Sequence, residues 1–287
     1  MRLKDLKRAN LWAVAGVSAC VGIGVAQPGA VAAPAPVAAV RDTALPTVAA
    51  VTTPAAAVPQ LARAVLEGVG IESGAEAAQV QAALGALADD VRRQSDPKAL
   101  TMAFKAYFAY KAAQPEDVRK PYLYFVDYGL DATTPRGYVF DMNTLEVVEG
   151  PFTVAHGRGS APGGSSMPTR FSNREGSAAS SLGLFLTQEV YSFTGHSGGR
   201  AYSSTGLRLK GLSGRFNDAA RQRRVVVHGA PYVTASKAGR SEGCPAMEPA
   251  RARRLLPKIG NGGLVFLFSP TDRAWMSNDP WAGLAAG

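Results

Sequence analysis

The 287-residue chain predicts a mainly β fold, a β-rich sandwich or barrel, with N-terminal helices and a few short peripheral helices. Two observations favour this class. From residue 122 onward, short runs of β-branched and aromatic residues alternate with turn-forming residues, at a spacing of roughly eight to twelve residues. Before that point the chain consists of low-complexity and helix-favouring segments, which predict helices and a linker at the N-terminal side of the domain.

Residues 1–32 have the organisation of a secretory signal peptide. A basic start precedes an uncharged apolar run from Leu11 to Val25, and Ala30-Val31-Ala32 then suits signal-peptidase cleavage. The apolar run is shorter than the ~20 residues that a membrane span needs. A retained anchor and lipidation at Cys20 are the two alternatives. The segment predicts export to the periplasm or cell envelope.

Three further boundaries follow from composition. Residues 33–60 are rich in alanine, valine and proline, and predict a linker. Residues 61–97 predict a helical segment, with two short helices interrupted by glycines. The main domain is expected at 98–275, followed by a tail at 276–287. It begins with an amphipathic helix, Lys98 to Ala113, whose start is marked by Ser95-Asp96-Pro97.

The main domain is expected to alternate strands and turns. Strands are predicted at 122–126, 136–142, 145–148, 152–156, 183–187, 206–212, 225–227 and 263–268, and short helices at 215–223 and 248–256. Glycine- and serine-rich loops are predicted at 157–164 and 172–181, where Asn173 could bind a polar peptide or sugar. His196 is flanked by Gly195 and Ser197, which predicts a flexible loop that could touch a substrate.

Two residues carry the chemistry. Val225 to Val227 predicts a buried strand that ends at His228. Cys244 lies between a glycine, which lets the backbone approach a ligand closely, and a proline, which stiffens the turn. If the signal peptide is removed, this thiol has no intramolecular partner. A cysteine on such a turn, with a histidine in reach, is a candidate nucleophile, and a buried inert cysteine is the alternative.

The segment His228-Gly229 followed by Ser241-Glu242-Gly243-Cys244 resembles the catalytic signature of the murein L,D-transpeptidases, which have a YkuD-like fold. Glu242 stands where the main branch most often has histidine, and Pro245 replaces the usual arginine after the cysteine. The run from Arg240 onward resembles a divergent branch with Gly-Arg-Ser-X-Gly-Cys-Pro-Ala. Further segments resemble this branch: Val154-Ala155-His156-Gly157, Phe171-Ser172-Asn173, Ser180-Ser181-Leu182-Gly183 and Leu207 to Leu212.

This resemblance implies a β-rich catalytic domain that acts on tetrapeptide stems of peptidoglycan. The cysteine attacks the carbonyl before the terminal D-alanine, and His228 serves as acid and base after pairing with the Cys244 thiolate and lowering its pKa. Backbone N–H groups near Gly243 and Cys244 hold the oxyanion, while Ser241 forms hydrogen bonds in the turn. Arg240 is the candidate for binding a substrate carboxylate. No cofactor is expected.

The acyl acceptor stays open. The amine of another stem peptide would give a 3–3 cross-link, a lysine would attach an envelope protein, and water would make the protein an L,D-carboxypeptidase. A zinc hydrolase built on His156, His196, His228 and Cys244 is a rival, but the metal-ligand spacings are missing. A non-catalytic peptidoglycan-binding protein is the rival from another class. Apart from the zinc alternative, His156 and His196 are expected to line the substrate cleft or to be structural.

The formal net charge is +9. Arginines cluster near the candidate site in sequence, at positions Arg221, Arg223, Arg224, Arg251, Arg253 and Arg254. Nucleic acid is not the expected partner, because an exported protein rarely meets it. The carboxylates of stem peptides or anionic lipids explain the basicity, and a solvated basic surface without a partner explains it equally well. The sequence does not predict an oligomeric state.

Overall fold

The computed structural model describes residues 74–283, so the predicted signal peptide, the linker and residues 61–73 lie outside the described residues. Residues 74–87 are helical. The remaining helices are α2 (Ala99–Ala113), α3 (Pro249–Ile259), α4 (Arg273–Asn278) and the short 3-10 helices η1 (Arg158–Ser160), η2 (Pro162–Gly164), η3 (Gly214–Phe216) and η4 (Asp218–Ala220). The strands are β1 (Tyr122–Asp127), β2 (Gly137–Asp141), β3 (Glu146–Phe152), β4 (His156–Gly157), β5 (Gly183–Ser197), β6 (Arg200–Gly211), β7 (Val226–Gly229), β8 (Arg240–Ser241), β9 (Ala246–Met247) and β10 (Leu264–Phe268).

The strands confirm the predicted β-rich class. Eight of them form one mixed sheet in the order β3-β2-β1-β10-β5-β6-β7-β9, and β4 pairs with β8 in a small second sheet. The pairs β1–β10, β7–β9 and β4–β8 are parallel. Within residues 74–283, no helix combines the length and the apolarity that crossing a membrane would require.

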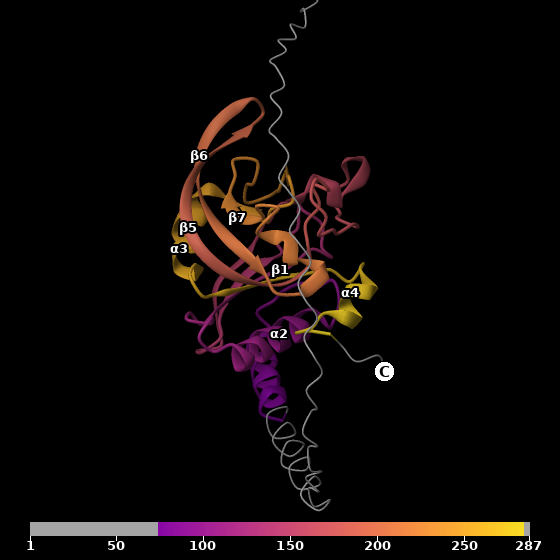
Figure 1. Ribbon diagram of the computed structural model, residues 1–287, viewed down its shortest axis with the longest axis vertical. Coiled ribbons are helices and arrows are strands. Elements are labelled where there is room, and N and C mark those ends of the chain that lie inside the picture. Colours follow the sequence, from indigo (N-terminus) through magenta and orange to yellow (C-terminus); the bar gives the residue numbers. More distant parts are fainter. Residues whose placement is uncertain (1–73, 284–287) are drawn as a thin grey trace, which may run out of the picture. The chain divides into compact units, whose positions relative to one another are not determined.

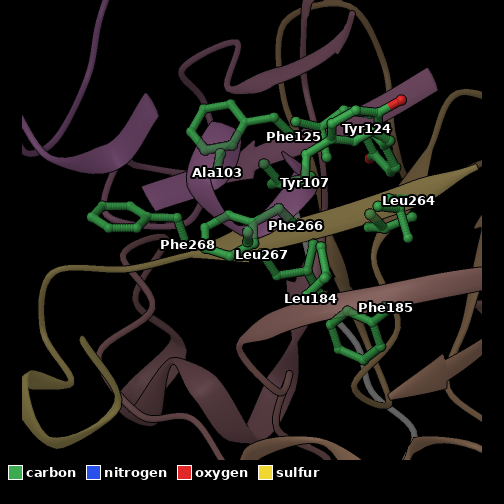
Figure 2. Packing of buried hydrophobic residues seen from close by; sticks show 14 of the residues in the cluster. Ala103, Tyr107, Tyr124, Phe125, Leu184, Phe185, Leu264, Phe266, Leu267 and Phe268 are labelled. Atoms are coloured by element: carbon green, nitrogen blue, oxygen red, sulfur yellow. The ribbon is translucent and has the colours of Figure 1, made fainter. Parts of the chain in front are cut away.

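The apolar core lies where α2 packs against the central strands. Figure 2 shows Tyr107 of α2 gathered with Phe125 of β1 and Phe266 of β10, all fully buried. Trp275 of α4 packs against the same region, because its ring lies 5.8 Å from that of Phe268. Trp281, in the predicted tail, donates a hydrogen bond through Nε1 to a backbone oxygen of the domain at 2.8 Å.

The hairpin of β5 and β6 is much longer than the predicted strands 183–187 and 206–212. It curves away from the other strands and projects beyond them (Figure 1). Gly198 and Gly199 form its two-residue turn with φ of 56° and 76°, the left-handed conformations that such tight hairpins need. The prediction stopped early because residues 190–205 contain many serines, threonines and glycines, which also suit a loop.

Two predicted elements are wrong. No continuous strand covers residues 152–156, because β3 ends at Phe152. The next residue leaves the sheet, and its side chain contacts a distant loop: the Thr153 hydroxyl donates to the Thr234 carbonyl at 2.5 Å. The predicted helix 215–223 is instead the pair η3 and η4. Asn217 interrupts it with φ of −154°, and its buried side chain accepts from the Ser213 amide and donates to two carbonyls of the segment entering β5.

A buried arginine and a buried histidine fix the start of β4. Arg136 and His156 have no exposed surface, and Arg136 Nη2 lies 2.9 Å from His156 Nδ1. Because a guanidinium only donates, Nδ1 must accept and the imidazole is neutral. Burial, with the charges of Arg136 and then Arg240, lowers the pKa of His156 to about 3. Burial also lowers the pKa of Arg136, to about 10.

This neutral histidine predicts acid sensitivity of the fold. Since the unfolded chain protonates His156 near its ordinary pKa of about 6.5 and the folded chain does not, the free energy of unfolding falls as the pH falls from about 6.5 towards 3. The expected contribution is about 1.4 kcal/mol per pH unit. The variant His156→Gln should lose this contribution, as measured by urea unfolding at pH 7.5, 6 and 5. His196→Gln removes an exposed imidazole as the matched control. An unchanged pH slope in His156→Gln would contradict this origin.

Candidate active site

The parallel pairing of β7 with β9 brings the two candidate residues together. His228 lies in β7 opposite Ala246 of β9, and its backbone amide donates to the Pro245 carbonyl at 3.2 Å. Cys244 precedes Pro245, so the turn that carries the thiol is attached directly to the strand that carries the imidazole. His228 and Cys244 are sixteen positions apart in the sequence, and the short pairing of β7 with β9 brings them together.

The ring of His228 is held in one orientation. Its Nδ1 lies 3.1 Å from the carbonyl oxygen of Gly229, which only accepts, so Nδ1 carries the proton and Nε2 keeps a lone pair. Only 7% of the residue is exposed. Burial lowers its pKa below the ordinary value, and the hydrogen bond to Gly229 partly opposes this. At neutral pH the imidazole is therefore a free base.

The turn at Cys244 is held by two serine hydroxyls. Ser241 Oγ donates to the Cys244 carbonyl at 2.6 Å and accepts from the Gly243 amide at 3.2 Å. Ser180 Oγ donates to the Gly243 carbonyl and accepts from the Gly157 amide, both at 3.0 Å. Three backbone groups of the turn are therefore fixed, and the hydroxyls tie it to β4 and to the loop before β5.

Glycine is required at position 243. Its φ is +125°, and a Cβ there would lie 2.9 Å from the Ala179 carbonyl oxygen. Its amide is already bound to Ser241, whereas no hydrogen bond of the described residues uses the amide of Cys244. Of the two predicted oxyanion donors, the amide of Cys244 is therefore without a partner among the described residues, whereas the amide of Gly243 already donates to Ser241.

The thiol rests in its protonated form. Cys244 Sγ faces the carbonyl oxygen of Arg224 at 3.9 Å, and no hydrogen bond within the described residues joins it to the His228 ring. Arg224 has φ of 57°, a left-handed conformation uncommon for a non-glycine residue, which aims that carbonyl at the sulfur. Burial raises the pKa of the thiol, opposed by the Val226 backbone and by the charge of Arg223. This direction is opposite to the predicted depression by His228.

Aromatic side chains of the β5–β6 hairpin lie beside His228. The Phe193 ring is 5.6 Å from the imidazole, edge to face, and Tyr232 approaches it at 6.4 Å. Tyr202 contacts Phe193 in turn, at 6.1 Å. Because Gly206 pairs with His228 and Tyr191 pairs with Gly206, the rings of Tyr191, Phe193 and Tyr202 share the face of the sheet that carries the imidazole. Tyr232 reaches the imidazole from the segment that follows β7.

His196 lies on the opposite face, in the strand rather than in the predicted flexible loop. It is paired with Ala201 within β5 and β6, and its position differs from that of Phe193 by an odd number of residues. Since side chains alternate along a strand, His196 points away from the face of His228 and into solvent.

Arg240 and His156 are neighbours, but only Arg240 is exposed. They pair across β8 and β4, and the charge of Arg240 contributes to the lowered pKa of His156. The guanidinium of Arg240 forms no ion pair with any described residue. Glu242, two residues later, forms an exposed ion pair in which its Oε1 lies 2.7 Å from Arg158 Nε. Arg240 is thus available to an anionic ligand, whereas the complete burial of His156 favours its structural alternative.

Asn173 serves the fold. Its amide donates to the Arg215 carbonyl and to Asp218 Oδ1, and its oxygen accepts from the Ala219 amide. These bonds anchor the η3–η4 segment that leads into β7. An adjoining cavity of about 240 Å³ is lined by Phe171, Ser172, Asn173, Leu182, Arg215, Phe216 and Asp272. Both polar atoms of the Asn173 side chain are therefore engaged within the protein, and its predicted contact with a ligand stays a prediction.

The arginine cluster of the sequence is divided in the structure. Arg251 and Arg254 bind Glu149, and Arg221 binds Glu189. Arg223 turns inward to the loop 172–181. Among residues 74–283, no group of three histidine, cysteine or acidic side chains is placed to hold a metal ion.

Sequence patterns did not single out several residues of the site. Ser180 belongs to a segment that carried the resemblance, but its role depends on contacts with Gly157 and Gly243, which come from distant parts of the chain. Arg223 looked like one basic residue among several. Two structural features set Arg223 and Arg224 apart from the other arginines. Arg224 has a left-handed backbone, and the side chain of Arg223 points inward to the Ala179 carbonyl.

Comparison with known proteins identifies the family. Residues 92–268 match the family described as L,D-transpeptidase catalytic domain (YkuD_2). The comparison with curated proteins found no match. An L,D-transpeptidase from Mycobacterium smegmatis aligns with a TM-score of 0.31 and 19% identity over 52% of this chain and 58% of that chain. An L,D-transpeptidase (Yku) from Stackebrandtia nassauensis aligns with a TM-score of 0.32 and 15% identity, over 61% of this chain and 69% of that chain.

The chain thus spans less than two thirds of the Mycobacterium smegmatis protein. The family match itself covers more than half of the present chain and includes the whole of the turn at Cys244 and the strand at His228. On this ground, the protein belongs to the L,D-transpeptidase catalytic domain family.

Proposed function

We propose that this protein is an exported cell-wall L,D-transpeptidase that acts on tetrapeptide stems through an acyl-enzyme on Cys244. The observation that carries the proposal is the strand pair β7–β9, which attaches the cysteine turn to a buried, neutral histidine with a free Nε2 lone pair. The family match supports the same chemistry. The basic N-terminus and apolar run of the sequence support export to the periplasm.

The first half-reaction begins with proton transfer. Because the thiol and the imidazole are both neutral at rest, the proton of Sγ passes to His228 Nε2 as the sulfur attacks the carbonyl carbon before the terminal D-alanine. The thiol must first leave the Arg224 carbonyl. The Cys244 amide donates to the oxyanion, and the Gly229 carbonyl stabilises the imidazolium through Nδ1.

The first half-reaction ends when His228 gives its proton to the departing D-alanine amine as the C–N bond breaks, which leaves a thioester on Cys244. In the second half-reaction, an acceptor amine attacks the thioester carbonyl and passes a proton to His228. The C–S bond then breaks, and His228 returns the proton to the sulfur to restore the thiol. An amine of another stem gives a 3–3 cross-link, a lysine attaches an envelope protein, and water gives L,D-carboxypeptidase activity. Arg240, exposed and without an ion pair among the described residues, is the proposed contact for a substrate carboxylate.

Mass spectrometry tests the covalent step. The wild-type protein, incubated with purified disaccharide-tetrapeptide, should gain a covalent adduct at Cys244 with loss of D-alanine and then release 3–3 dimers. Cys244→Ala should form no adduct. In a chain that keeps residues 1–32, Cys20→Ala, the matched cysteine control, should form it at the wild-type level. His228→Gln keeps the thiol but loses the base, and adduct formation should slow by roughly 10²–10⁴-fold.

Each other result has a definite meaning. An adduct that yields only tripeptide would identify water as the acceptor and make the protein an L,D-carboxypeptidase. A folded wild-type protein that forms no adduct would overturn the proposal and favour a non-catalytic role at the wall.

The pH dependence of kcat/KM gives an independent prediction. Because the folded pKa of His228 is lowered, the imidazole remains a base as the pH falls through 6.5. The acid limb of the profile should therefore lie below pH 6.5 and should disappear in His228→Gln. An acid limb above pH 6.5 would instead indicate an imidazole stabilised in its charged form, contrary to its burial.

A further inference from the structure

Arg223 holds the loop that covers the cysteine turn. It lies just before β7 and is half-buried. Its Nη1 donates to the Ser172 carbonyl at 2.8 Å and to Ser181 Oγ at 2.6 Å. Its Nη2 donates to the Ala179 carbonyl at 2.7 Å and to Ser177 Oγ at 3.2 Å. The planar guanidinium therefore fixes both ends of the loop 172–181.

The same guanidinium lies against the turn that carries the thiol. A Cβ on Gly243 would lie 3.5 Å from Arg223 Nη2 and 2.9 Å from the oxygen of Ala179, to which that nitrogen donates. Ser180, the next residue of the loop, donates to the Gly243 carbonyl. The cation, the loop and the turn thus form one packed unit, with the positive charge next to the residue before Cys244.

This charge has no carboxylate partner within hydrogen-bonding distance among the described residues. All four of its acceptors are neutral carbonyl or hydroxyl oxygens. The exposed Arg221, two residues earlier, instead binds Glu189. Burial lowers the pKa of Arg223, opposed first by Cys244 and then by Glu175. An uncompensated, half-buried cation favours a negative charge on the neighbouring sulfur.

Neighbouring groups act on the sulfur with opposite preferences, and the Val226 backbone favours the thiolate together with Arg223. The carbonyl oxygen of Arg224 accepts from the neutral thiol and repels a thiolate. The guanidinium of Arg223 acts in the other direction. We infer that Arg223 is a positioning residue of the reaction, which fixes the loop 172–181 over the turn and stabilises the developing thiolate of Cys244. This inference rests on the proposed function in taking Cys244 as the reacting group.

The pH profile of thiol alkylation tests the inference without a peptidoglycan substrate. The full chain is treated with iodoacetamide at pH 6 to 10, and mass spectrometry follows the peptide that contains Cys244, so that Cys20 does not contribute. Removing a neighbouring cation raises a thiol pKa by about one unit, which lowers the thiolate fraction about tenfold below that pKa. Arg223→Gln should shift the profile to higher pH by this amount. Arg221→Gln, the matched control, should keep the wild-type profile.

Two further variants separate charge from structure. Arg223→Lys keeps the charge but loses the planar set of donors, and should stay within about threefold of the wild-type labelling rate. Ser177→Asp places a carboxylate beside the guanidinium and should shift the profile upward even if Arg223→Gln does not fold, whereas Ser177→Asn should not. The other titratable groups electrostatically coupled to the thiol or placed beside it are unchanged in all variants: Glu242, Tyr128, Tyr191, Tyr202, Tyr232 and His228.

A wild-type profile in Arg223→Gln, or equal shifts in Arg223→Gln and Arg223→Lys, would overturn the inference, because the charge would then have no role of its own. Failure of the proposed function is distinguishable. If the profile depends on Arg223 as expected but the tetrapeptide forms no adduct, the substrate assignment fails while the effect of Arg223 on the thiol stands.

Discussion

The site depends on the parallel pairing of two very short strands. Only His228 and Gly229 of β7 pair with Ala246 and Met247 of β9. This contact sets the distance between imidazole and thiol, because the cysteine turn enters β9 directly. Parallel strands need a crossover rather than a tight turn, and residues 230–245 provide it. On its way this segment pairs β8 with β4, so the crossover is itself anchored.

The protonation states of the two candidate residues follow from their surroundings, in which His228 is buried and Cys244 is partly exposed. Burial lowers the pKa of His228 and raises that of Cys244, so both directions favour uncharged partners. Such a pair lacks the preformed thiolate of many cysteine enzymes. In the proposed reaction, the thiol passes its proton to His228 only as the sulfur attacks the substrate carbonyl. The serine hydroxyls at the turn and the carbonyl of Gly229 supply the fixed geometry on which that transfer depends.

The sequence predicted most of the fold because local patterns decide it. The helix Ala99–Ala113 and the strands Tyr122–Asp127 and Leu264–Phe268 have uniform apolar patterns and short flanking turns, and each was predicted within one or two residues. The full length of the β5–β6 hairpin was not predicted. In its outer part Tyr191 and Phe193 alternate with polar residues, and whether such a segment forms a strand depends on its partner strand. The helix expected at 215–223 failed because the tertiary hydrogen bonds of Asn217 overrode local helix preference.

For the site, motif spacing singled out His228 and Cys244, which the strand pairing brings together. The substrate-binding roles expected for Arg240, His156, Asn173 and His196 stay predictions. The amide of Asn173 donates to the Arg215 carbonyl and to the Asp218 carboxylate, and His156 is enclosed. Nothing in a single sequence shows which side chains turn inward. The contributions of Ser180 and Arg223 arise only where a loop folds over a distant turn.

The alternation of faces along β5 and β6 constrains the length of this hairpin. On one face, the rings of Tyr191 and Tyr202 cover the glycines paired with them, Gly206 and Gly195, since a Cβ on either glycine would come within 3 Å of the ring. Adding or deleting one residue at the base of one strand would exchange the two faces beyond that point. The aromatic rings would then turn to solvent and His196 would take their side. Substitutions in the β5–β6 hairpin are therefore easier to accommodate than insertions of a single residue. Changes in its length should involve two residues at a time or fall at the turn of Gly198 and Gly199.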